Sequence, residues 1–236
     1  MKWELESISS VVFCPTFNSA DVFRVWSALF GDSPDQMMKA PPGAPPGGHA
    51  FAVIEGIHTS VTVSPGRIEC AVRGDGGENF SPPLIADRNQ ALARLMEAAH
   101  KLIDYLSDSQ INRVALVSVL QNPVDSQPDA VSVFREETKI GANIAPDDAL
   151  DLSFTVNRRV KLSNDVTVNR IFRCGTAIGQ FVSVQVDGTT ATPSVIDFPS
   201  CFIHLDLNNV AQPMSGDQAK QLLSELVSEA GATIFR

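Results

Sequence analysis

The sequence lacks any excess of positive charge. Its 27 acidic and 18 basic residues give a formal net charge of −9, so no general basic surface is available to bind phosphate groups. This balance argues against a nucleic-acid-binding protein and against attraction to an anionic membrane. Long hydrophobic runs are also missing, since no window approaches about 18 consecutive apolar residues, and we expect no membrane-spanning helix. With 44% hydrophobic and 19% charged residues, the composition predicts a folded, soluble chain.

Cysteine is scarce, and its spacing excludes the common structural uses of this residue. The four cysteines are widely separated and contain no CxxC pair: Cys14, Cys70, Cys174 and Cys201. This spacing favours small buried hydrophobic residues in a reducing cytoplasm over a disulfide framework or a zinc site. The first six residues carry two acids and no apolar stretch follows, so we expect no secretory signal and a cytoplasmic location.

The common catalytic motifs are absent as well. The sequence contains no Walker A loop, no GxGxxG, no GxSxG and no HExxH. These absences disfavour the common nucleotide hydrolases, dehydrogenases and α/β-hydrolases, although enzymes without such signatures stay open. We expect no cofactor and no metal ion.

Three segments show helical periodicity, over residues 22–30, 92–106 and 216–230. Gly31 follows the first segment at the position typical of a C-terminal helix cap. The second segment carries an uninterrupted apolar stripe with charged residues off the stripe. Ser215 and Gln218 form a capping-box pattern at the start of the third, and Gly231 is expected to end it.

Between these helices the period changes to two, which indicates strands. Residues 61–63 and 68–72 flank Pro65 and Gly66, and residues 181–186 lead into Asp187 and Gly188, so both places predict hairpins. Val114–Leu120 is apolar on both faces, which predicts a central strand covered on each side. Replacing Leu116 or Val117 with Asp is therefore expected to prevent folding.

Nine or ten strands and three amphipathic helices predict an α+β fold of mostly antiparallel sheets with the helices packed on them. An internal echo links Ser60-Val61 and Pro65 with Ser194-Val195 and Pro199, each followed by a strand and a helix. The echo suggests two pseudo-repeated halves. Coincidence is the alternative, because a hairpin followed by a helix is a common unit. We place the halves at 1–122 and 123–236, with a hinge near 123–151, and a single domain as the alternative.

His204 and Asp206 are the first candidate site residues. In an extended segment they share one face, about 7 Å apart, while Ile203 and Leu205 occupy the other. Two such polar side chains suit joint contact with a ligand or a water molecule. The alternative is an ordinary solvent-facing side of an antiparallel strand.

Arg170 is the third candidate and belongs to a local positive patch with Arg158, Arg159 and Arg173. On paired strands, Arg158 and Arg170 are expected to face each other across the turn at residues 163–165. The patch suits a carboxylate or phosphate group. Cross-strand salt bridges to neighbouring acids are the alternative.

Two classes of function follow from these features. The first is a non-catalytic interaction or assembly protein, with a protein partner or a second copy of itself bound through a strand edge or through the helix surface of Val22, Trp26 and Phe30. The alternative is a small-ligand-binding protein or enzyme with a polar pocket around His204, Asp206 and Arg170. A nucleic-acid-directed protein using the arginine patch is a third and weaker hypothesis. The sequence itself does not decide among them.

Overall fold

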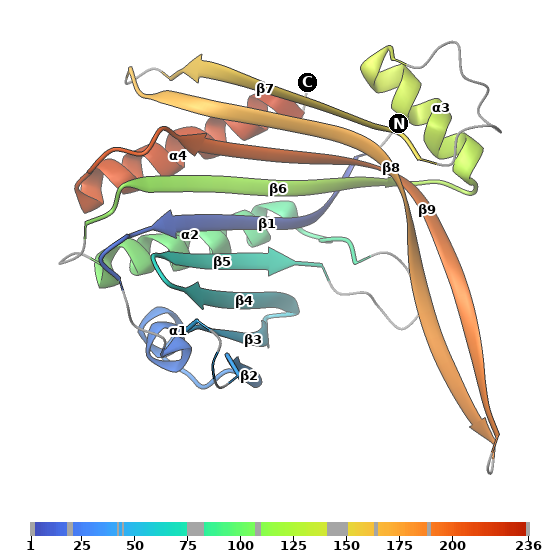
Figure 1. Ribbon diagram of the computed structural model, residues 1–236, viewed down its shortest axis with the longest axis horizontal. Coiled ribbons are helices and arrows are strands. Elements are labelled where there is room, and N and C mark those ends of the chain that lie inside the picture. Colours follow the sequence, from blue (N-terminus) through green and yellow to red (C-terminus); the bar gives the residue numbers. More distant parts are fainter. Residues whose placement is uncertain are drawn as a thin grey trace.

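The computed structural model describes residues 3–17, 21–41, 43, 45–74, 83–106, 110–140, 151–162, 165–187 and 190–234 (Figure 1). The strands in these ranges are β1 (Glu4–Phe13), β2 (Gln36–Lys39), β3 (Gly48–Ile54), β4 (Ile57–Ser64), β5 (Arg67–Arg73), β6 (Arg113–Pro123), β7 (Ser153–Lys161), β8 (Thr167–Asp187) and β9 (Thr190–Asn209). The helices are α1 (Val22–Phe30), α2 (Arg88–Tyr105), α3 (Gln127–Thr138) and α4 (Gly216–Ile234). All described strands form one antiparallel sheet in the order β2-β3-β4-β5-β1-β6-β9-β8-β7.

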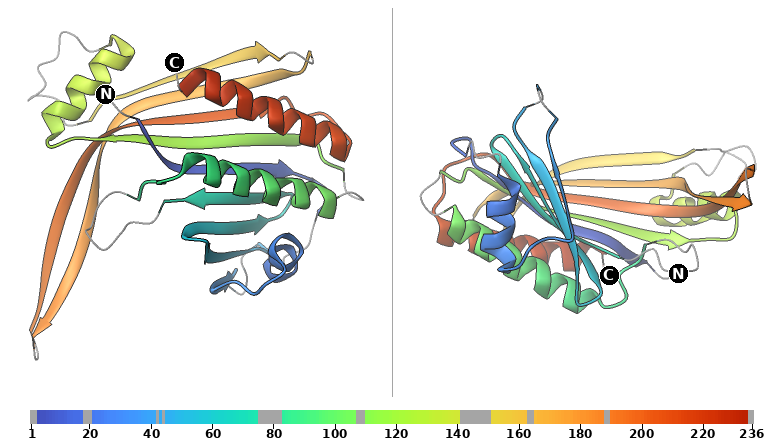
Figure 2. Two further views of the ribbon diagram at one scale, coloured as in Figure 1. Left: turned by 180° about the vertical axis from the view of Figure 1, so that it is seen from behind. Right: turned by 90° about the horizontal axis from the view of Figure 1, so that it is seen from below.

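The helices gather on one face of this sheet. The long helices α2 and α4 run side by side over the central strands (Figure 2), while α1 packs against β3, β4 and α2, and α3 packs against β8 and β9. The apolar stripe of α2 faces the sheet and buries residues such as Leu95, Leu102 and Ile103. None of the described helices is long and apolar enough to cross a membrane. We call the opposite side, which carries Ser9, Val117 and Asp206, the open face.

The predicted α+β class is confirmed, with one helix more than expected. The additional helix, α3, lies inside the segment that the sequence suggested as a hinge. Pro128 does not prevent it, because proline is tolerated in the first helical turn, where its missing N–H has no intrahelical partner. The Ser126 hydroxyl caps this turn by accepting the Asp129 N–H at 3.3 Å. Residues 141–150 of the predicted hinge lie outside the described residues.

Several local predictions are confirmed at the level of hydrogen bonds. Gly31 caps α1 with a left-handed φ of 80°. Ser215 and Gln218 form the expected reciprocal capping box, with distances of 2.9 and 3.2 Å. Gly231, however, does not end the last helix, which continues to Ile234. All four cysteines are free and buried, as predicted, and the Sγ atoms of Cys174 and Cys201 lie 3.8 Å apart.

The topology repeats. Apart from the short edge strand β2, which has no counterpart, the series β1-α1-β3-β4-β5-α2 and β6-α3-β7-β8-β9-α4 have the same order of elements. Their strands are arranged symmetrically about the β1–β6 pair. The sequence echo, in contrast, does not join equivalent places: Ser60 lies on β4, Ser194 on β9, and Pro199 inside β9 rather than in a turn. The second unit begins with β6, so the topology divides the chain between α2 and β6. A domain boundary near residue 123 stays a prediction.

The central strand β6 is interior, between β1 and β9, as the sequence predicts. Its two faces differ, however. Val114 and Leu116 are fully buried under the helices, whereas Val117 and Val119 lie half-buried on the open face. The expectation of cover on both sides is therefore wrong at Val117 and Val119, where no described helix packs on the open face.

Candidate functional site

His204 and Asp206 lie on the open face, as the alternation along β9 predicts. In the register of the sheet, His204 stands between Val119 of β6 and Arg173 of β8. Asp206 stands between Val117 and Ile171. Both candidate residues are half-buried, so they remain accessible to solvent from this side.

Arg170, the third candidate, lies on the other face of the sheet. It is paired in register with Leu207, which is buried beneath the helices, and its guanidinium forms an ion pair with Glu229 of α4 at 3.0 Å. The structure therefore does not bring Arg170 to His204 and Asp206. The reason is the two-residue period of a strand, which places Arg170 and Arg173 on opposite faces. Arg173 is the arginine beside His204.

The four arginines of the predicted patch also lie on two different faces of the sheet. Arg158 is the register partner of Arg170, as expected, and this pair shares the helix side of the sheet. Arg159 is paired with Asn169 and shares the open face with Arg173. A single anion on one side of the sheet therefore cannot contact all four guanidinium groups.

The electrostatics of His204 follow from its position. Burial lowers the pKa of His204 below the ordinary value of 6.5, the Asp206 carboxylate opposes this effect, and the Arg173 guanidinium adds to it. The imidazole is therefore neutral at neutral pH, when it can accept a hydrogen bond through one ring nitrogen and donate one through the other.

We expect the two neighbours of His204 to change its titration in opposite directions. Arg173→Gln should raise the pKa of His204, and Asp206→Asn should lower it further, both measurable by NMR titration of the imidazole. Because the folded state binds fewer protons than the unfolded state, stability should fall as the pH drops below 6.5. His204→Gln should reduce this loss in thermal unfolding between about pH 7.5 and 5.5. An unchanged His204 titration in both neighbour variants would contradict the assignment.

A second histidine–arginine pair occupies the open face of the first half. His58 of β4 is the register partner of Arg73 of β5, on strands that are topologically equivalent to β8 and β9. With His49 and Phe51 of β3, they line a shallow cavity of about 240 Å³. Burial and the Arg73 charge lower the pKa of His49, whose Nδ1 lies 3.0 Å from the Thr62 hydroxyl. Sequence reasoning missed this group because His49 follows a Pro/Gly-rich run that reads as a loop.

The longest strands form an arm. β6 pairs with β9 only as far as Ser200, and β7 pairs with β8 only as far as Gly175. Beyond these residues, β8 and β9 pair with each other and with no other described strand, from Ile178↔Pro199 to Asp187↔Thr190 (Figure 1). At about 3.4 Å per residue the arm extends roughly 30 Å from the sheet. The predicted hairpin is confirmed by this pairing, while Gly188 lies outside the described residues.

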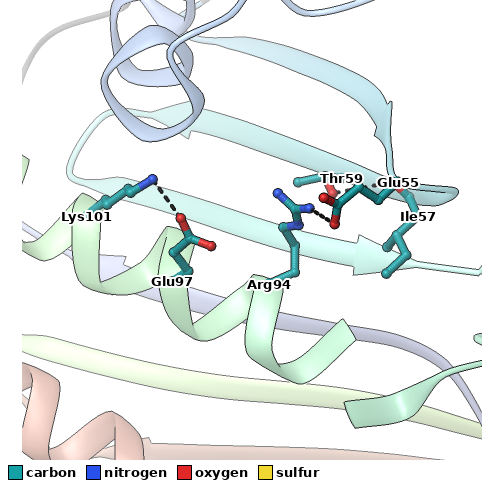
Figure 3. A network of polar contacts seen from close by, with 6 residues as sticks. All are labelled: Glu55, Ile57, Thr59, Arg94, Glu97 and Lys101. Atoms are coloured by element: carbon teal, nitrogen blue, oxygen red, sulfur yellow. Dashed lines mark hydrogen bonds and ion pairs between the residues drawn. The ribbon is translucent and has the colours of Figure 1, made fainter. Parts of the chain in front are cut away.

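A cavity between α1, α2 and β3 is lined by residues of all three elements. It encloses about 400 Å³. Two ion pairs cross or follow its rim (Figure 3): Arg94 of α2 pairs with Glu55 of the β3–β4 turn, and Lys101 pairs with Glu97 at 2.8 Å. The hydrogen bond and charge of Lys101 lower the pKa of Glu97. The lining residues of the cavity lie far apart in the sequence, in α1, β3, α2 and the segments beside them, so no local sequence motif predicts it.

The expected self-association surface on α1 is not exposed in the structure. Val22 and Trp26 were candidates for an exposed self-association surface, but both are almost fully buried. Among the large apolar residues of α1, only Phe23 is exposed. Trp26 instead lines the cavity and packs against Phe30 with ring centroids 4.5 Å apart.

No protein-family model and no curated protein sequence matches this chain, so its function has to be inferred from the arm, the open face and the cavity themselves.

Proposed function

We propose that this chain is a non-catalytic assembly protein whose β8–β9 arm joins it to a second copy. The observation that carries the proposal is the stretch of β8 and β9 that no third strand covers among the described residues. An isolated two-stranded hairpin is marginally stable in water, because few of its apolar residues are buried. On the arm, Ile178, Val195 and Ile196 are 49%, 54% and 39% exposed, which favours a role in contact with a partner.

The two edges of the arm differ in their ability to pair. The Pro199 carbonyl accepts the Val124 N–H at 3.1 Å, so the backbone groups of Pro199 point away from β8. The same holds for every second residue of β9. The outer edge of β9 therefore carries Pro193, Asp197 and Pro199. Proline lacks the donor that a further strand needs, and a charge on an edge opposes pairing.

The outer edge of β8 has no such protection. The Thr176 N–H donates to the carbonyl of Leu152, the residue before β7, at 2.9 Å. The backbone N–H and C=O groups of the even-numbered residues of β8 therefore point away from β9. Along the arm these are Ile178, Gln180, Val182, Val184 and Val186, with neither proline nor charge. Such an edge favours addition of another strand.

A second copy of this chain fits that edge. In an antiparallel pair centred on Val182, Ile178 of each copy stands opposite Val186 of the other, and Gln180 opposite Val184. β-branched pairs stabilise a sheet, and no like charges face each other. The contact is isologous and closes as a dimer. The proposal keeps a cytoplasmic location, which the four free cysteines favour.

The test uses a matched pair of proline substitutions. Val182→Pro removes the central donor from the outer edge of β8, whereas Val195→Pro, at the register partner of Val182, removes a donor only from the edge of β9. Each dimer loses two hydrogen bonds at the centre in the first variant, about 1 kcal/mol each, so we expect at least about tenfold weaker dimerisation. Light scattering after size exclusion at several concentrations measures it.

In this experiment the parent and Val195→Pro should be dimers and Val182→Pro a monomer. A parent protein that stays monomeric at all concentrations would refute self-assembly. Equal dimerisation of the two variants would instead place the interface away from the β8 edge.

The alternative function, a small-ligand binder or enzyme acting through His204 and Asp206, also stays a proposal. The observation that favours it is the half-buried His204 between Arg173 and Asp206, an arrangement suited to a ligand with both polar and anionic groups. Arg170 has no part in it, because its guanidinium pairs with Glu229 on the other face.

A further inference from the structure

The cavity between α1, α2 and β3 has the size and lining of a small-molecule site. Its volume of about 400 Å³ lies within the range of about 300–1,000 Å³ that is usual for ligand pockets. Trp26, Leu29 and Ala98, each at most 3% exposed, contribute the apolar part of the lining. An apolar body placed against these residues would be removed from water, which stabilises binding.

The charges on the rim of the cavity are not balanced evenly. Both cations are already neutralised, Arg94 by Glu55 and Lys101 by Glu97 (Figure 3). Asp32 and Asp35, in the segment after α1, have no ion pair among the described residues. Asp35 accepts the Val53 N–H at 2.9 Å through one oxygen, which leaves the other available. The charge that an occupant would meet on this side is therefore negative.

A second observation concerns Trp26 itself. Its indole N–H is buried, and no acceptor for it exists in the described part of the chain. A buried donor without a partner costs about 1–3 kcal/mol in a folded protein. Trp26 also lines the cavity, so an occupant whose oxygen acceptor reaches this N–H, with a small shift of the side chains that now cover it, would remove that cost.

We propose that this cavity binds an organic ammonium ion with an apolar body and a hydrogen-bond acceptor. The ammonium group pairs with the carboxylates of Asp32 and Asp35, the body packs against Leu29 and Ala98, and the acceptor receives the Trp26 N–H. This site is independent of the arm and of the assembly function, because its residues come from α1, α2 and β3.

The experiment compares three related probes by isothermal titration calorimetry on the full chain. Tyramine carries the ammonium, an aromatic body and a hydroxyl acceptor. Tyrosol keeps the body and the phenol but replaces the ammonium with a neutral hydroxyl, and phenethylamine keeps the ammonium but lacks the phenol. We expect tyramine to bind at least about tenfold more tightly than tyrosol, which corresponds to one paired charge. The Trp26 indole NMR signal should shift more with tyramine than with phenethylamine.

Two isosteric variants locate the charge. Asp32→Asn and Asp35→Asn should each weaken tyramine binding at least about fivefold, since an amide keeps the shape but loses the ion pair. Asn at position 35 still accepts the Val53 N–H, so the fold is retained. The matched control is Asp125→Asn, an exposed acid in the segment between β6 and α3. Absence of tyramine binding at millimolar concentration, equal binding of tyrosol, or parent-like binding in both variants would overturn the proposal.

Discussion

Leu116→Lys is expected to abolish the native fold, whereas the same substitution at the next residue, Val117→Lys, is expected to preserve it. Leu116 is 1% exposed and lies beneath the helices, so a lysine there buries an unpaired charge. The cost, of about 4–5 kcal/mol or more, is comparable with the whole stability of many domains. Val117 lies on the open face, where its register partner Asp206 offers an opposite charge. Cross-strand pairing and solvent access keep the expected change within about 1 kcal/mol.

Far-UV circular dichroism and urea denaturation of the purified variants measure both effects. A conservative control, Leu116→Met, keeps apolar volume and should cost less than about 1.5 kcal/mol. If Val117→Lys also fails to fold, the open face would have to be covered in the native protein. That outcome would restore the expectation, drawn from sequence, that β6 is buried on both sides.

Features that depend on residues close together in the sequence could be predicted from it. Features that depend on pairing between distant segments could not. The capping box at Ser215 and the hairpin around Gly66 are local, because each depends on side chains and backbone angles within a few residues. Helix α3 has only a narrow apolar face, formed by Ala130, Val131 and Phe134, and it carries a proline in its first turn. A short pattern of this kind resembles a loop.

The candidate site shows the same limit. Alternation along β9 correctly places His204 and Asp206 together, but it carries no information about which residue of β8 lies beside them. That choice depends on register, which pairs His204 with Arg173 and leaves Arg170 under α4. Likewise, nothing in the sequence of β8 marks residue 175 as the last one that β7 covers. The arm therefore becomes visible only in the assembled sheet.

The second large effect is expected at Phe134, the largest buried residue of α3. Its side chain is 1% exposed and packs in the core between α3 and the strands β8 and β9. Phe134→Ala removes most of this contact and leaves a cavity, which costs about 3–5 kcal/mol. For a chain of this size we expect the melting temperature to fall by about 10 °C or more. Differential scanning calorimetry measures the shift.

The matched control for this substitution is Glu136→Ala, two residues along the same helix and exposed. It should change the melting temperature by only a degree or two, because an exposed side chain contributes little to stability. The comparison also bears on assembly, since α3 packs on the two strands that continue into the arm. Loss of the Phe134 contact loosens that base, so dimerisation should weaken in Phe134→Ala and not in Glu136→Ala. Equal melting temperatures for the two variants would show that α3 adds nothing to the core and that the arm is supported by the sheet alone.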